Sequence, residues 1–144
     1  MPLDAQMAGL RQTLAEFEID PPTELRKFLP LCDGHSGKCC IAAEWIVWQA
    51  GLNSGLVLVH GKCRSIGKNQ DDHAWVEVPG GLVYDAVLGR VYPWADYQKT
   101  LMAVVSKRYN AKQVAALTRS ILNCGPWTEE EEKEAFAHMP LEEI

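Results

Sequence analysis

Two short runs of apolar and polar residues around a Pro-Gly-Gly turn constrain the fold of this chain more than any other feature. Residues 73–78 (HAWVEV) and 82–87 (LVYDAV) flank the turn at 79–81. Runs rich in β-branched and aromatic residues on either side of a short Pro/Gly turn predict a β-hairpin. With a loop of these three residues, Val78 lies opposite Leu82.

The register of this hairpin predicts a polar pair on one face. Counting outward from the turn, Trp75 lies opposite Asp85 and His73 lies opposite Val87. Because side chains alternate with period two, these four side chains project from the same face, and Asp85 is the diagonal neighbour of His73. A carboxylate acceptor fixes the tautomer of an imidazole and stabilises the imidazolium that forms during proton transfer. The hairpin therefore predicts a histidine base with its orienting acid.

A cysteine lies upstream at the predicted start of a helix. Residues 34–38 are typical of a loop, Cys39 opens a run that continues through residues 40–50, and Gly51 closes this run like a helix cap. The positive end of the helix dipole lowers the pKa of a thiol in the first turn, and a nearby imidazolium lowers it further. Unpaired backbone N–H groups at the helix start suit the binding of an oxyanion.

These segments resemble the transglutaminase-like cysteine superfamily, which has the papain-like fold. The resemblance rests on the segment 37–39 (GKC) with Ala43 four residues on, the strand 57–61 (VLVHG), the segment 73–77 (HAWVE) and an aspartate at the end of the partner strand. It covers about residues 37–87. The sequence is more similar to small bacterial and phage members, such as the lasso-peptide leader peptidases, than to the large animal transglutaminases.

The resemblance implies a catalytic triad of Cys39, His73 and Asp85 that cleaves or transfers an acyl group through the thiol. The sequence departs from the family pattern in two respects. Its cysteine helix reaches Gly51 about one turn early, and a second cysteine, Cys40, follows the first.

Helix geometry favours Cys39 over Cys40 as the nucleophile. Positions at helical spacing from Cys39 are small and apolar: Ala42, Ala43, Ile46, Val47 and Ala50. The equivalent positions from Cys40 include Glu44 and Trp48. In a papain-like fold the nucleophile helix packs on the sheet that bears the histidine, so we expect the thiol on the apolar face. Cys40 remains the alternative nucleophile.

Composition predicts one domain over residues 1–144. A chain of 144 residues with 47% hydrophobic residues is long enough to bury a core without disulfides, and its odd count of 5 cysteines favours reduced thiols. The net charge is -5, with acid concentrated at 129–132 and no basic stripe, so we expect no nucleic-acid partner. There is no apolar run of membrane-spanning length and no signal-peptide pattern at the start, so we expect a cytoplasmic protein without a membrane partner.

The predicted fold class is α+β, a papain-like core whose nucleophile helix packs on a small antiparallel sheet between N- and C-terminal helices. Helical spacing predicts a helix over 3–17, a short one from Thr23, and one that starts at Pro93 and runs through Tyr97, Leu101, Val104 and Val105. Further helices are predicted after the caps Asn110 and Thr128, the last ending near His138.

Three other interpretations compete with the enzyme. Cys32, His35, Cys39 and Cys63, with His60, have spacings that resemble zinc knuckles, which would make the chain a zinc-binding structural or interaction protein. A catalytically inactive member of the family would bind a peptide without cleaving it. A buried His–Asp pair can also serve stability alone.

The function that the sequence favours is a small cysteine hydrolase or acyltransferase without metal or cofactor. The Cys39 thiolate attacks an amide or ester carbonyl, His73 transfers the proton, and Asp85 orients His73. The expected substrate is a peptide, a protein or a small amide. Water as acceptor makes the enzyme a peptidase or amidase, and an amine makes it a transamidase; the sequence leaves this choice, the substrate and the oligomeric state open.

Overall fold

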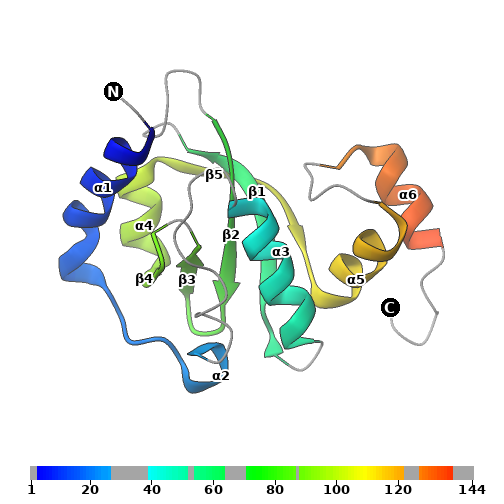
Figure 1. Ribbon diagram of the computed structural model, residues 1–144, viewed down its shortest axis with the longest axis horizontal. Coiled ribbons are helices and arrows are strands. Elements are labelled where there is room, and N and C mark those ends of the chain that lie inside the picture. Colours follow the sequence, from blue (N-terminus) through cyan, green and yellow to red (C-terminus); the bar gives the residue numbers. More distant parts are fainter. Residues whose placement is uncertain are drawn as a thin grey trace.

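The computed structural model describes residues 3–26, 39–51, 54–63, 71–86, 88–121 and 127–137, without the side chains of 3–7, 24, 39–42, 45, 71 and 72. In this part of the chain, helices pack on a five-stranded antiparallel sheet of order β4-β3-β2-β1-β5 (Figure 1). The predicted α+β class is therefore confirmed.

The strands of the sheet are β1 Val57–Cys63, β2 Asp71–Val78, β3 Leu82–Asp85, β4 Arg90–Pro93 and β5 Ala103–Tyr109. The helices are α1 Leu3–Leu14, α2 Thr23–Arg26, α3 Cys39–Ala50, α4 Trp94–Leu101, α5 Ala111–Ser120 and α6 Glu129–Ala137, and a 3-10 turn, Ala15–Phe17, extends α1. The cysteine helix thus has the predicted bounds. Gly51, which follows it, adopts a positive φ of 76° that suits a glycine cap.

The predicted hairpin is present with the predicted register. Val78 pairs with Leu82, and the ladder continues through Glu77 with Val83 to Val76 with Tyr84. Val87, the expected partner of His73, lies outside the described residues. The short Pro-Gly-Gly turn therefore sets which side chains of β2 and β3 share a face.

The two faces of the sheet bury separate apolar clusters. One cluster joins the sheet to α3, α5 and α6 through residues such as Ile46, Val76 and Leu117. The other joins it to α1 and α4 through residues such as Leu14, Trp75 and Tyr97. In Figure 1, α1 and α4 lie on one side of the sheet and α3 and α5 on the other. The central strands of the sheet are thus buried on both faces, and successive residues along each strand belong to different clusters.

The prediction of one helix from Pro93 through Val105 is wrong at its C-terminal end. Helix α4 stops at Leu101, Met102 adopts a left-handed conformation with φ 53° and ψ 47°, and the chain continues as β5. Helical periodicity does not distinguish a strand here, because Val104 and Val105 favour strands more than helices. Pairing with β1 decides the outcome, since β5 completes one edge of the sheet.

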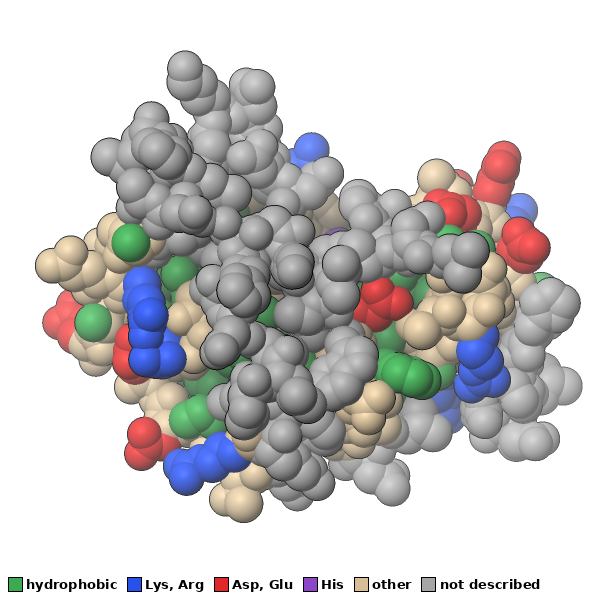
Figure 2. All heavy atoms as spheres, viewed as in Figure 1, with side chains coloured by type: hydrophobic (Ala, Val, Ile, Leu, Met, Phe, Trp, Pro, Cys, Tyr) green, Lys and Arg blue, Asp and Glu red, His purple; other side chains and the backbone are tan. Residues whose placement is uncertain are grey.

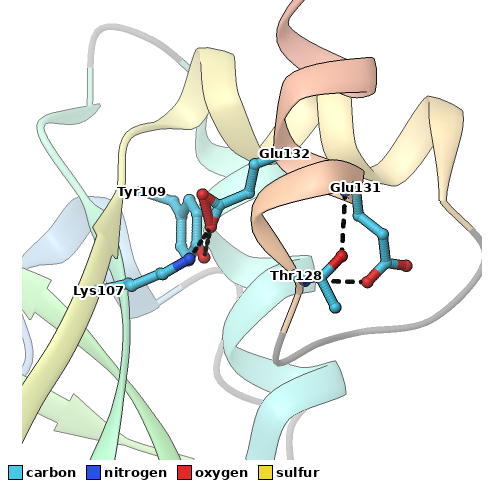
Figure 3. Close-up of polar contacts among 5 residues, drawn as sticks. All are labelled: Lys107, Tyr109, Thr128, Glu131 and Glu132. Atoms are coloured by element: carbon cyan, nitrogen blue, oxygen red, sulfur yellow. Dashed lines mark hydrogen bonds and ion pairs between the residues drawn. The ribbon is translucent and has the colours of Figure 1, made fainter.

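The C-terminal helices begin at the predicted caps. At the start of α5, the side chain of Asn110 accepts a hydrogen bond from the backbone N–H of Gln113. The side chain of Gln113 in turn accepts one from the backbone N–H of Asn110. Thr128 and Glu131 form the same reciprocal pair at the start of α6 (Figure 3). Each capping box satisfies backbone N–H groups that the first helical turn leaves unpaired.

A polar cluster also joins α6 to the edge strand β5. The carboxylate of Glu132 accepts from the Tyr109 hydroxyl at 2.7 Å and pairs with the Lys107 ammonium at 2.5 Å (Figure 3). Both partners lie on β5. Burial and the neighbouring Glu132 raise the pKa of Tyr109, so its hydroxyl remains a donor at neutral pH.

Candidate functional site

His73 and Asp85 form the hydrogen-bonded pair that the hairpin register predicts. The His73 Nε2 atom lies 2.7 Å from Asp85 Oδ2. His73 is 7% exposed and Asp85 is fully buried. A buried carboxylate within hydrogen-bond distance fixes the position of the ring and favours a proton on Nε2.

Asp85 accepts two further hydrogen bonds that hold its carboxylate in place. The Tyr97 hydroxyl donates to Oδ2 at 2.5 Å, and the backbone N–H of Leu88 donates to Oδ1 at 2.9 Å. Burial alone raises the pKa of this carboxyl, but the charge of His73 and the three donated hydrogen bonds outweigh it and lower the pKa below its ordinary value of 3.8. Asp85 is therefore an ionised acceptor at neutral pH.

Sequence reasoning did not identify Tyr97 or Leu88 as parts of this site. Tyr97 was expected on a helix, as one of a periodic apolar set, and it is buried in the cluster between α4 and the sheet. Its hydroxyl reaches Asp85 because α4 packs against β3 and β4. The sequence gives only a weak indication of this contact. A buried tyrosine hydroxyl usually has a polar partner, but helical spacing does not predict which residue it is.

Aromatic rings surround the polar pair on the same face of the sheet. Trp75 lies next to His73, with ring centroids 6.0 Å apart, and it also contacts Trp94 and Tyr97 at 5.9 Å each. Tyr92 stacks on Tyr97 at 6.1 Å. Trp75 is fully buried, so it belongs to the core rather than to an exposed lining of a cleft.

Cys39 is the first residue of α3, and its side chain lies outside the described part of the structure, as does that of Cys40. The described side chains of α3 that enter the core pack on the face of the sheet that includes Val76. His73 and Asp85 point to the other face, toward Tyr97 of α4. Helix α3 thus packs on the sheet that bears His73, as expected, but its apolar side and the histidine lie on opposite faces of that sheet.

Helix α3 nevertheless begins near the end of the sheet that carries His73. Figure 1 shows α3 and β2 running in the same direction, so the first turn of α3 lies toward the start of β2. The described pairs between β2 and β3 span Val76–Val78 and stop before His73 is reached. On its other side, His73 pairs with Gly61 of β1.

Two residues of the zinc alternative lie on opposite faces of β1. His60 stacks on Trp127, with ring centroids 5.0 Å apart, on the side of α5 and α6. Cys63 is buried in the cluster on the side of α1 and α4. Strand alternation therefore prevents this pair from binding one ion. Cys32 and His35 lie outside the described residues, and the described ones contain no group of three metal-binding side chains close enough to share an ion.

Charged side chains of both signs are interspersed on the surface. On the face drawn in Figure 2, the described Lys and Arg side chains lie in small groups beside Asp and Glu rather than in one basic patch. Arg108 pairs with Glu77, and Arg90 pairs with Glu18. Among the described helices, none is both long and apolar enough to span a bilayer.

Comparison of the chain with protein-family models, curated proteins and solved structures returned no match. The fold and the site alone therefore define the class of this protein. It is an α+β protein with a five-stranded antiparallel sheet and a buried His–Asp–Tyr network on one face.

Proposed function

We propose that this chain is a cysteine-dependent hydrolase or acyltransferase that acts on an amide or ester bond of a peptide, a protein or a small amide. The observation that carries the proposal is the 2.7 Å contact between His73 and a buried, ionised Asp85, formed by the hairpin that the sequence predicts. An imidazole oriented in this way is suited to exchange a proton with a nucleophile. Cys39, at the first turn of α3, is the proposed nucleophile.

In this proposal the two ring nitrogens of His73 have separate roles. Nε2 contacts the carboxylate, so Nδ1 is the atom that would accept the thiol proton and later donate it to the leaving group. The thiolate would attack the carbonyl carbon, and the bond to the leaving amine or alcohol would break as that group takes the proton. Water or an amine would then release the acyl group from the sulfur.

The thiol has to approach His73 from the start of β2. The apolar side of α3 packs on the opposite face, but the described β2–β3 pairs end at Val76, three residues from His73. Helix α3, which begins at Cys39, starts toward this same end of the sheet.

A second candidate role is structural, and the burial of the pair favours it. His73 is 7% exposed and Asp85 is fully buried, as is usual for a pair that supports the core. In that case the chain is not an enzyme at this site. The two proposals differ in the chemistry of Cys39, which a structural pair leaves unchanged.

Alkylation of Cys39 by iodoacetamide across a range of pH distinguishes the two roles. Peptide mass spectrometry follows Cys39 and Cys40 separately, and the buried Cys63 provides an internal reference. In the enzyme, Cys39 reacts well below the ordinary thiol pKa, this low-pH reactivity disappears in His73→Ala, and it weakens in Asp85→Asn. A single titration near the free-cysteine value in all three proteins would rule out an activated thiol at Cys39. If Cys40 shows the low-pH reactivity instead, the nucleophile moves by one residue and the assignment of Cys39 is wrong.

A further inference from the structure

The Tyr97 hydroxyl shares one carboxylate oxygen with the imidazole of His73. Both groups contact Asp85 Oδ2, Tyr97 at 2.5 Å and His73 at 2.7 Å. A separation of 2.5 Å lies in the range of charge-assisted O–H···O⁻ bonds, which are stronger than bonds between neutral groups. Tyr97 thus makes the shortest of the three described hydrogen bonds to this carboxylate.

The surroundings of Tyr97 fix the direction of its hydroxyl. The ring is fully buried and contacts Trp75, Tyr92 and Trp94, at centroid distances of 5.9, 6.1 and 6.2 Å. These contacts come from β2, β4 and the start of α4, so the ring is held from several directions. A donor held in this way loses little freedom when it binds the carboxylate.

We propose that Tyr97 is a positioning residue, which acts through Asp85 by holding Oδ2 against His73 Nε2. This inference rests on the function proposed above and extends the Cys–His–Asp set by a fourth residue from α4. Through its described hydrogen bond, Tyr97 acts on the Asp85 carboxylate. It secures the acceptor that orients His73, while Leu88 secures the other oxygen.

Titratable groups from three elements lie around Asp85. His73 comes from β2, Tyr97 from α4, and Tyr92 from β4. The negative charge of Asp85 contributes to raising the pKa of Tyr92, so Tyr92 is neutral and adds no charge in the pH range where Asp85 titrates. The hydroxyl of Tyr92, however, is buried without any hydrogen-bond partner, which makes it a matched control.

The test compares Tyr97→Phe with Tyr92→Phe, since each removes one buried hydroxyl and retains the ring. Carbon-13 NMR follows the Asp85 carboxyl, and nitrogen-15 NMR follows the His73 ring, both across pH. Loss of the Tyr97 hydroxyl removes a donor to the ionised form. We expect the Asp85 titration in Tyr97→Phe to move upward by roughly one to two pH units. The Nε2-protonated fraction of neutral His73 should also fall, and Tyr92→Phe should change neither signal.

A purely packing role for Tyr97 gives a different result. Phenylalanine preserves the ring contacts, so the Asp85 titration would then coincide in all three proteins and the inference would be overturned. A shift of the same size in Tyr92→Phe would also overturn it, because the effect would not depend on the Asp85 contact.

The pH dependence of Cys39 alkylation separates this inference from the proposed function. If Cys39 has low-pH reactivity in the wild type but Asp85 does not shift in Tyr97→Phe, the role of Tyr97 is wrong and the enzyme proposal stands. If Asp85 shifts but Cys39 has no activated thiol in the wild type, Tyr97 holds Asp85 as inferred and the enzyme proposal is wrong.

Discussion

At the scale of single residues, Asp85 is a buried acceptor of three described hydrogen bonds. It is fully buried, yet it carries a charge that three donors compensate. A buried charge without partners is costly, so removing any donor destabilises the ionised form. The same residue links the stability of the fold to its proposed chemistry.

The lowered pKa of Asp85 predicts a specific loss of stability in acid. Its folded-state pKa lies below the ordinary value of 3.8, so the stabilisation is fully present above 3.8 and is lost as the pH falls from there through the folded-state pKa. We expect the free energy of unfolding to decline more steeply below this value in the wild type than in Asp85→Asn. Urea unfolding at several pH values measures the two slopes.

The control for this prediction is Asp20→Asn, which removes an exposed carboxyl. Its slope should match the wild type. Equal slopes in the wild type and Asp85→Asn would contradict the prediction, because the carboxylate would then contribute no pH dependence of its own.

Gly61 permits the close packing next to His73. A Cβ at this position would lie 2.3 Å from the Val104 backbone oxygen and 2.6 Å from the Trp75 ring. Neither can move freely, since one is ladder backbone and the other is fully buried. We expect Gly61→Ala to lower the free energy of unfolding by about 1–3 kcal/mol, as overpacking does.

Gly9→Ala is the matched control for Gly61→Ala. Gly9 lies within α1 and a Cβ there meets nothing within 4 Å. Alanine favours the helix over glycine by about 1 kcal/mol, so this variant should be as stable as the wild type or more so. Urea unfolding measures both variants, and equal losses would contradict the crowding account, because a Cβ at Gly9 meets no other atom within 4 Å.

At the scale of elements, the junction of α4 and β5 decides the edge of the sheet. Met102 ends α4 in the left-handed conformation, and its N–H bonds to the carbonyl of Gln98. This conformation is unfavourable for residues other than glycine by about 1–2 kcal/mol. The left-handed residue lets the chain pass directly from α4 into β5, and the pairing of β5 with β1 compensates the strain.

The strain at Met102 predicts a stabilising substitution. Met102 is 50% exposed, so Met102→Gly removes little packing and relieves the left-handed conformation. After the entropy that glycine loses on folding, we expect a gain of about 0.5–1 kcal/mol in the free energy of unfolding. Met102→Ala keeps the strain and serves as the control in the same urea titration. An alanine variant more stable than the glycine variant would contradict this account.

At the scale of the whole molecule, two apolar clusters on opposite faces of one sheet organise the fold. The helix that begins at Cys39 packs on one face, opposite α4 (Figure 1). The His73–Asp85–Tyr97 network lies on the face that α4 covers. Apolar cores of this kind supply the burial that a small metal-dependent domain lacks. His60 and Cys63 also belong to different clusters, which argues against a zinc site that uses both.

We therefore expect the protein to fold without zinc. Purified protein dialysed against a chelator should keep its circular dichroism spectrum and its melting temperature, and elemental analysis should find far less than one zinc ion per chain. Stoichiometric zinc whose removal unfolds the protein would support the zinc alternative instead, because structural zinc contributes directly to folding.

The sequence alone determined those features that depend on neighbouring residues. The Pro-Gly-Gly turn set the hairpin register, and period-two alternation then placed Asp85 against His73. The capping boxes at Asn110 and Thr128 were predictable for the same reason, since each is a pattern of four consecutive residues with a local hydrogen bond.

The tertiary structure decided what depends on packing between distant segments. Whether Val104 and Val105 continue a helix or form a strand depends on the open edge of β1, which local periodicity does not reveal. The hydrogen bond from Tyr97 to Asp85 requires α4 to pack on the sheet, and the side of the sheet that α3 covers is set by its contacts with β1, β2 and α5. These choices follow from burial of apolar surface between whole elements, a collective property that no short segment of the sequence contains.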